Sequence, residues 1–228
     1  MEAFLRTFFD TALIGRYLPD LLLGVGVTVA VGLAVVATGL VAGLVLALLR
    51  TLGNRPLNFV LIAVVDMFRA LPPLVIILLI YFGLPNIGVV IPNFLVLWIC
   101  LSAVLAAFSE EIFWAGITAT PRGQWLAARS TGLTFGQTLF FVVLPQAVRI
   151  AIPPLTNRAI SITKNTSLGS AIGVSDVLGR AMTAQAFSAN ATPLMMAAII
   201  YVIIFVPLVI ASRLLERNYR WGVRRWTS

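Results

Sequence analysis

The stretch LLLGVGVTVAVGLAVVATGLVAGLVLALL, residues 21–49, has no charged side chain along its 29 positions. A bilayer core about 30 Å thick is crossed by roughly 20 apolar helical residues, so this stretch is long enough for one crossing. It is also longer than the apolar part of a cleaved signal peptide, which has roughly 7–15 residues. The segment before it carries the acids Glu2, Asp10 and Asp20. We therefore interpret residues 21–49 as a retained first membrane span.

The composition of the whole chain agrees with a membrane location. Of the 228 residues, 60% are hydrophobic and 11% are charged, whereas a soluble domain has about a quarter charged residues and less than half apolar ones. This apolar content is enough for about five crossings with short loops. The net charge of +8 would also suit a nucleic-acid-binding protein. In so apolar a chain we interpret it as the mark of cytoplasmic loops, with no nucleic-acid partner.

Several chemistries are excluded by the residues that the chain lacks. It has no histidine and a single cysteine, Cys100, which excludes histidine-based metal sites, histidine-activated nucleophiles and internal disulfides. The only lysine is Lys164, which follows Thr163, so a Gly-Lys-Ser/Thr phosphate loop is absent. If ATP drives this protein, another subunit must bind the nucleotide.

The distribution of arginines predicts the topology. Basic regions lie at residues 50–56, at residues 120–149 and in the tail after residue 212, whereas residues 84–92 are uncharged. Basic loops stay in the cytoplasm, so an even number of crossings must separate one basic region from the next. This requirement adds a polar fourth span to the four that hydropathy indicates. We predict five transmembrane helices with the N-terminus outside and the C-terminus inside, at about residues 21–49, 57–83, 93–115, 147–175 and 193–212.

The fourth predicted span is unusually polar. It contains the pair Pro153-Pro154, Arg158 and Lys164, followed by Asn165, Thr166 and Ser167. Polar and charged side chains are costly against lipid, and paired prolines interrupt helical hydrogen bonding. We expect a discontinuous helix that faces a water-filled cavity. The alternative is a polar seam between helices that binds no ligand.

Two further patterns concern the first fifty residues. Apolar and charged residues alternate over residues 1–20, which predicts either an interfacial amphipathic helix or a simple leader into the first span. Gly39 and Gly43 form a G-x-x-x-G pair, with Gly32 one heptad earlier, and this spacing favours close helix packing.

Residues 118–146 form a loop that is too long to be a simple connection between spans. Pro121 suits the first turn of a helix, with Thr120 as its cap, and Gly132 ends that helix. Thr134 is expected to cap a second short helix that ends before Pro145. Two short helices with a glycine elbow indicate either a cytoplasmic docking knob or a loop that lies along the membrane.

The same loop carries a resemblance to a known family. Residues 123–133 (GQWLAARSTGL) and 144–147 (LPQA) resemble the cytoplasmic EAA loop of ABC-type import permeases, with Leu126 at the position of the family's glutamate. Other segments resemble the polar amino acid branch of this family: residues 67–74 (MFRALPPL), 81–85 (YFGLP), 111–113 (EIF) and 164–168 (KNTSL). The whole resemblance covers about residues 20–215. The family usually has a basic residue at the position of Trp114.

The resemblance implies a fold and a set of partners. The chain would be a single all-α, polytopic permease domain over residues 1–228, in a bacterial cytoplasmic (inner) membrane, and would not itself be an enzyme. A second permease, identical or related, would complete the translocation path through the lipid. Two ATPase subunits would bind ATP and Mg²⁺, an extracytoplasmic protein would deliver the amino acid, and this chain would hold no cofactor or metal. The residues expected to couple to the ATPase are Ala127, Ala128, Gly132, Leu133 and Pro145.

Candidate substrate-path residues come from the charges inside the spans. Lys164 with Asn165, Thr166 and Ser167 suits an amino acid's α-carboxylate, or else the segment pins a broken helix to its neighbours.

The other charged residues of the spans have local partners as well as possible roles in transport. Asp66 and Arg69 stand at i, i+3 and are expected to form an ion pair. Glu110 and Glu111 could each bind an ammonium group or pair with an arginine, and we expect Arg158 to be structural or at the inner surface.

The function that these expectations support is ATP-driven amino acid import. A passive channel would explain the polar span but not the cytoplasmic loop, and an intramembrane scaffold for polar solutes would not need charge within its spans. An intramembrane enzyme would require a nucleophilic or water-activating set of residues, which the sequence does not supply.

Overall fold

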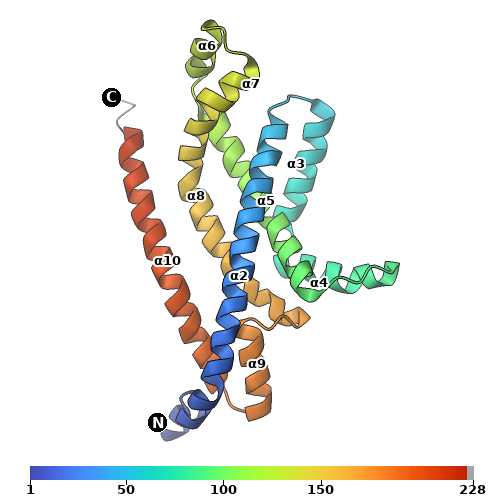
Figure 1. Ribbon diagram of the computed structural model, residues 1–228, viewed down its shortest axis with the longest axis vertical. Coiled ribbons are helices and arrows are strands. Elements are labelled where there is room, and N and C mark those ends of the chain that lie inside the picture. Colours follow the sequence, from blue (N-terminus) through green and yellow to red (C-terminus); the bar gives the residue numbers. More distant parts are fainter. Residues whose placement is uncertain (225–228) are drawn as a thin grey trace. The chain divides into compact units, whose positions relative to one another are not determined.

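The computed structural model describes the backbone of residues 1–224 and the side chains of residues 1–215. Regular structure within these residues is entirely helical (Figure 1), which confirms the predicted all-α class. The elements are α1 (Glu2–Phe8), α2 (Thr11–Arg50), α3 (Arg55–Ala70), α4 (Pro73–Gly83), the 3₁₀ helix η1 (Leu84–Ile87), α5 (Asn93–Ala119), α6 (Arg122–Ser130), α7 (Phe135–Thr138), the π-helix η2 (Leu139–Val143), α8 (Leu144–Lys164), the 3₁₀ helix η3 (Asn165–Ile172), α9 (Val177–Ser188) and α10 (Thr192–Arg224). Of the basic tail, Arg213 is exposed, and the later arginines lie outside the described side chains.

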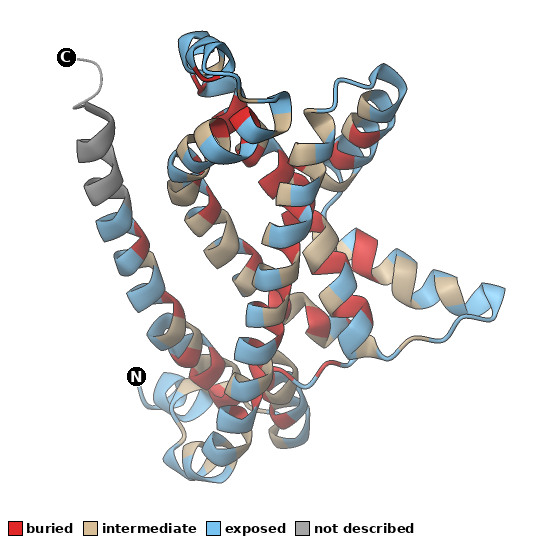
Figure 2. Cartoon of the chain, turned by 45° about the horizontal axis from the view of Figure 1, so that its top comes forward, coloured by how far each residue is buried: buried red, intermediate tan, exposed pale blue. Residues whose placement is uncertain are grey.

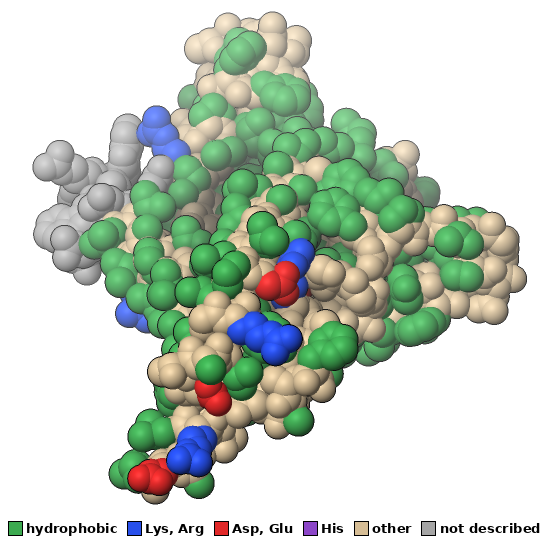
Figure 3. All heavy atoms as spheres, turned by 60° about the horizontal axis from the view of Figure 1, so that its bottom comes forward, with side chains coloured by type: hydrophobic (Ala, Val, Ile, Leu, Met, Phe, Trp, Pro, Cys, Tyr) green, Lys and Arg blue, Asp and Glu red, His purple; other side chains and the backbone are tan. Residues whose placement is uncertain are grey.

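Four helical segments of the described chain are long and apolar enough to cross a membrane. They are Glu2–Arg50, Asn93–Ala119, Phe135–Ile172 and Thr192–Leu215. The pair α3 and α4 is broken and sharply bent at Leu71–Pro72, and it makes a fifth candidate if it is counted as one span. Apolar side chains cover much of the face seen in the space-filling view, with few charged groups among them (Figure 3). The fold is therefore that of a polytopic membrane protein, and the count of five with the N-terminus outside stays a prediction.

Backbone contacts divide the chain into two compact units, which are described separately. The first unit comprises residues 1–37, 71–102 and 160–210, and the second comprises residues 38–70, 103–159 and the chain from residue 211. Helices α2, α5, α8 and α10 each contribute residues to both units.

The core of the first unit joins the beginning of α2 to α9 and α10 (Figure 2). Its fully buried members include Leu21, Val177 and Ala181, and Met196 and Ile200 pack beside them. Helix α9 begins at a buried cap, because the Asp176 carboxylate accepts hydrogen bonds from the Gly179 N–H at 2.8 Å and from the Tyr201 hydroxyl at 3.0 Å. Burial raises the pKa of the Asp176 carboxyl, and these two donors oppose that rise. The cap fixes the start of α9 against α10.

The core of the second unit joins the end of α2 to α5, η2 and α8. Its members are Ala47, Phe113, Ile117, Leu139, Val143, Ala147, Ala151 and Leu155. Helices α2 and α5 approach closely at the predicted glycine pair. A Cβ atom added at Gly39 would lie 2.7 Å from the Leu105 Cβ, and one at Gly43 would lie 2.4 Å from the Ser109 Cβ. The predicted use of this pair in close helix packing is confirmed.

The N-terminal residues divide between two helices. The short helix α1 has no buried residue and ends at Phe8. Asp10 then caps α2, its Oδ1 accepting from the Ala12 N–H at 2.9 Å, so that residues 11–20 continue directly into the first long helix. A single interfacial helix over residues 1–20 was one of two alternatives, and it is not observed because this cap starts a new helix.

Helix α8 runs without interruption through Pro153 and Pro154, so the predicted break at this pair is wrong. The fixed φ of proline is compatible with a helix. Because proline has no N–H donor, α8 continues here without the two backbone hydrogen bonds that residues 153 and 154 would otherwise donate. The change of geometry comes after Lys164, where the backbone tightens into η3 and ends at Gly173 with a φ of +80°.

Two expectations for the loop are also corrected. The second short helix does not end before Pro145, because α7, η2 and α8 follow one another without a gap. The π-helical turn just before Pro145 shifts the register of the backbone hydrogen bonds. This shift lets the helix continue past Pro145, which has no backbone N–H to donate. Thr120 does not cap α6, since its hydroxyl donates back to the Gly116 carbonyl at 3.3 Å and the helix starts after Pro121.

Candidate functional site

Arg69 is the centre of a charged cluster in the second unit. Its guanidinium pairs with Asp66 at 3.2 Å, one helical turn back on α3, and with Glu111 on α5. The predicted i, i+3 ion pair is therefore present, and Glu111 has an arginine partner as one of its two expected roles. About half of each carboxylate is exposed, 60% of Asp66 and 48% of Glu111. The structure thus brings three of the predicted path residues together.

The aromatic ring of Phe108 links this cluster to α8. The guanidinium carbon of Arg158 lies 3.3 Å from the centroid of the Phe108 ring, and that of Arg69 lies 5.6 Å from the same centroid. An aromatic face attracts cations within about 6 Å, so both contacts are favourable. Sequence reasoning missed Phe108, although it precedes Glu111 by three residues on α5 and so shares its face. The i, i+3 spacing was the signal that could have found it.

The neighbouring acid Glu110 belongs to a different ion pair. Its side chain is fully buried, and its Oε1 accepts a hydrogen bond from Arg50 at the end of α2, at 3.0 Å. The Trp114 ring lies 4.5 Å from the same guanidinium. The resemblance left the departure at Trp114 without a consequence, and the structure gives it one, because the indole covers the cation that neutralises Glu110.

The polar segment after Lys164 lies in the first unit. The Lys164 side chain is exposed, and its Nζ is 5.8 Å from the centroid of the Phe205 ring on α10. The hydroxyl of Thr166 donates to the Thr163 carbonyl at 2.8 Å, and that of Ser167 donates to the Lys164 carbonyl at 2.9 Å. Asn165 is half-buried at the start of η3. The two hydroxyls satisfy carbonyls where the helix changes from α geometry in α8 to 3₁₀ geometry in η3.

The predicted coupling residues lie on and beside the α6–α7 elbow. Gly132 has a φ of +91°, a conformation that glycine adopts without strain, and it separates the two helices. Thr134 and Gln137 form a reciprocal capping box at the start of α7. The rings of Trp125 and Phe135 stack across the elbow with centroids 5.6 Å apart. These contacts make the elbow a defined structure rather than an open loop.

The coupling residues themselves differ in exposure. Ala127 and Pro145 are exposed, Ala128 is buried, and Leu133 is half-buried. Leu126, at the position of the family's glutamate, is 68% exposed. Most of this surface is therefore available for contact with another protein.

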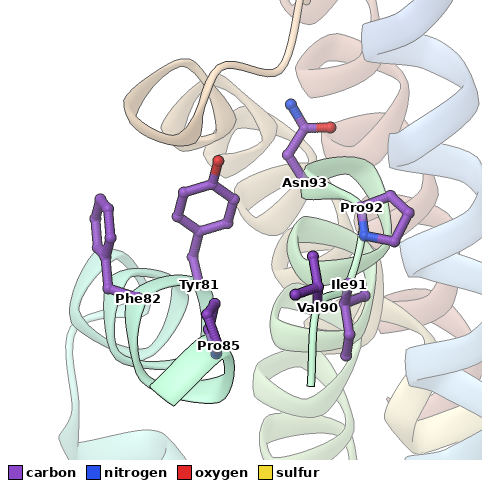
Figure 4. A pocket seen from close by; sticks show the side chains of 7 residues that line it. All are labelled: Tyr81, Phe82, Pro85, Val90, Ile91, Pro92 and Asn93. Atoms are coloured by element: carbon purple, nitrogen blue, oxygen red, sulfur yellow. The ribbon is translucent and has the colours of Figure 1, made fainter. Parts of the chain in front are cut away.

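A separate cavity of about 400 Å³ lies in the first unit between the end of the continuous stretch α4–η1 and the start of α5 (Figure 4). Its walls are mainly apolar; they are formed by Tyr81, Phe82, Pro85, Val90, Ile91, Pro92 and Asn93. The Asn93 amide already donates to the Gly173 carbonyl at 2.9 Å. This cavity contains none of the predicted path residues.

The chain matches one protein family over most of its length. Residues 39–221 match the binding-protein-dependent transport system inner membrane component. The chain belongs to this family. It is therefore the membrane translocation subunit, or permease, of an ABC-type transport system.

Individual relatives agree with this assignment. The permease is 33% identical over 197 residues to the probable glutamine ABC transporter permease protein GlnM of Bacillus subtilis (strain 168), covering 84% of this chain and 89% of the relative. It is 32% identical over 205 residues to the arginine transport system permease protein ArtQ of the same organism, covering 89% of this chain and 94% of the relative.

A solved structure also resembles the permease over nearly its whole length. This crystal structure of an amino acid ABC transporter with histidines matches with a TM-score of 0.84 at 31% identity, covering 92% of this chain and 98% of that one. The likeness supports the helical permease fold described above.

Proposed function

We propose that this permease is the membrane-spanning subunit of an ATP-driven amino acid importer. The observation that carries the proposal is the α6–α7 elbow, an exposed and internally braced knob on a chain that lacks a phosphate loop. Relatives that are permeases of glutamine and arginine systems support an amino acid as the cargo. A passive channel or a scaffold would not require such a knob.

The continuity of α7, η2 and α8 suggests how ATP would drive transport. ATP and Mg²⁺ would bind to two separate ATPase subunits, and closure of that pair would move the knob. Because α7 leads through η2 into α8 without a break, a displacement of the elbow would be passed directly to α8 and to the core around Val143 and Ala147. Ala127, Ala128, Gly132, Leu133 and Pro145 are the proposed coupling residues.

Two groups of polar residues are the proposed path. One is the Arg69 cluster with Asp66 and Glu111, and the other is Lys164 with the segment from Asn165 to Ser167. Charged side chains within membrane-spanning helices usually face a protein interior or a water-filled path, which supports both groups. Mixed charges suit a zwitterion, so the cargo could have an acidic, basic or neutral side chain.

The proposed assembly contains a second permease, identical or related, and an extracytoplasmic protein that delivers the amino acid. Its location would be the bacterial cytoplasmic membrane. The family to which the chain belongs is described as the inner membrane component of binding-protein-dependent systems, which supports both expectations.

The test begins with affinity purification of the tagged permease from its own host. We expect an ATPase subunit to be recovered with the wild-type chain and to be lost when residues 121–145 are replaced by a flexible linker. Reconstituted vesicles holding the recovered complex should then accumulate one or more labelled amino acids when ATP is supplied inside.

Three other results would contradict the proposal. Equilibration of solutes without ATP would indicate a passive channel, and binding without any flux would indicate a scaffold. Recovery of the same ATPase by the linker variant would remove the elbow from the docking surface.

A further inference from the structure

The two arginines beside Phe108 are paired unequally among the side chains that the structure describes. Arg69 is held by two carboxylates, those of Asp66 and Glu111. Among the side chains that the structure describes, no carboxylate lies within ion-pairing distance of Arg158. Within the described side chains, the Arg158 guanidinium thus has an aromatic contact but no anionic partner.

An arginine in this position is costly without an anionic partner. Arg158 lies inside the candidate span Phe135–Ile172 and is half-buried. Taking a charge out of water carries a free-energy penalty, and an aromatic contact offsets only part of it. A site of this kind is stabilised when an anion binds to it.

The contact with Phe108 leaves the guanidinium ready for such an anion. A guanidinium that stacks on a ring through its face keeps its N–H donors at its edge, where a carboxylate can accept two of them in parallel. The neighbouring acids complete the site for a zwitterion. Arg69 contacts Oδ1 of Asp66 and Oε2 of Glu111, and each of these carboxylates has a second oxygen.

We propose that Arg158, seated on Phe108, binds the α-carboxylate of the transported amino acid while Glu111 faces its α-ammonium group. The proposal rests on the function proposed above and adds the residues that recognise the part common to all amino acids. Phe108 positions Arg158, and Arg69 pairs with the two acids. Lys164 belongs to the other unit and is a separate candidate for the path.

The experiment compares an amino acid with its amide, which lacks the carboxylate. Uptake of both is measured in reconstituted vesicles, using the amino acid that the wild-type complex transports best. Arg158→Gln, Arg158→Lys and Phe108→Leu are compared with Arg149→Gln, which removes an exposed arginine from the same helix outside the cluster. Size-exclusion chromatography checks that each complex assembles.

We expect the wild-type complex to prefer the acid over the amide, and Arg158→Gln to abolish that preference. A charge-assisted hydrogen bond corresponds to roughly a 10- to 100-fold effect, so KM for the acid should rise by about that factor while KM for the amide stays nearly constant. Arg158→Lys should restore part of the preference, Phe108→Leu should weaken it, and Arg149→Gln should behave as the wild type does.

Several outcomes would overturn the inference. One is an acid preference that Arg158→Gln leaves unchanged, and another is a wild-type complex without any preference. If Arg158→Gln does not assemble, the Phe108→Leu variant provides the test. An unchanged acid preference in that variant would contradict the proposed positioning of Arg158 by Phe108. Loss of the Arg158 effect in vesicles of phosphatidylcholine alone would place an anionic lipid at the site instead. A wild-type complex that transports no amino acid would contradict the proposed function itself.

Discussion

Arg50 and Glu110 illustrate how single residues hold charge inside this apolar chain. The Glu110 side chain is fully buried, Arg50 donates to it at 3.0 Å, and Trp114 covers the guanidinium. Removing one partner of a buried ion pair leaves the other charge uncompensated, at a cost of about 3–5 kcal/mol. Such pairs are tightly coupled, whereas Lys164 and Arg158 have aromatic contacts and no ion pair among the described side chains.

Lys164→Met tests the second of these cations. We expect uptake to be abolished while the complex still assembles, because methionine keeps the length and apolar stem of lysine but removes the ammonium group. Lys164→Arg is the matched variant and should retain part of the uptake. Transport kinetics in vesicles measure both, and unchanged kinetics in Lys164→Met would remove this residue from the path.

At the scale of elements, the α6–α7 elbow and the α2–α5 contact depend on glycine for different reasons. Gly132 adopts a positive φ, which side-chain-bearing residues rarely do, and nothing lies within 4 Å of an added Cβ. Gly43 lies within a helix of ordinary geometry, but an added Cβ would meet Ser109 and the Ala106 carbonyl, the latter at 2.8 Å. Gly132 thus allows the backbone turn between α6 and α7, and Gly43 allows α2 and α5 to pack closely.

Gly132→Glu should uncouple transport from ATP hydrolysis while the permease inserts normally. The substitution strains the elbow and places a charge on the proposed docking surface. Gly53→Glu is the control, because Gly53 also has a positive φ and open space around it but lies between α2 and α3. Substrate-stimulated ATPase activity and uptake are measured together in vesicles; normal values for both in Gly132→Glu would contradict the coupling role.

Gly43→Leu should destabilise the permease by separating α2 from α5. Overpacking of a close contact costs about 1–3 kcal/mol, and here one of the opposing atoms is backbone, which cannot rotate away. Gly26→Leu is the control on the same helix, since nothing lies within 4 Å of a Cβ at Gly26. Thermal unfolding in detergent should show a lower midpoint for the Gly43 variant alone, and equal midpoints would contradict the packing argument.

At the scale of the whole molecule, the prediction concerns orientation in the membrane. The basic segments around Arg50 and Arg129 predict cytoplasmic loops, and the uncharged segment with Asn86 predicts an outer one. The native thiol of Cys100 is buried and can be replaced by alanine to give a background without cysteine.

Single cysteines at Gln124 and at Asn86, both exposed, would test that orientation. In intact cells we expect a membrane-impermeant thiol reagent to label Asn86→Cys and not Gln124→Cys, and in inverted vesicles the reverse. Labelling of both sites from one side would contradict the odd number of crossings between them.

Much of the local structure followed from the sequence because it depends on near neighbours. The apolar run of residues 21–49, the Asp66–Arg69 pair, the elbow at Gly132 and the cap at Thr134 each need information from a few adjacent positions. The Pro153-Pro154 pair and Pro145 show the limit of this reasoning. A proline weakens a helix locally, but whether the helix ends there depends on the packing and hydrogen bonding around it.

The sequence by itself therefore determined an all-helical membrane protein of the permease family with a structured loop, since hydropathy, spacing and motif order are written along the chain. Only the tertiary structure decided which charges meet between different helices. Glu110 and Glu111 are neighbours in the chain, but they pair with Arg50 and Arg69 on different helices. The role of Phe108 depends on its contact with Arg158, which α8 places on the face of the ring. These partners are far apart in sequence, and helix packing sets the distances between them.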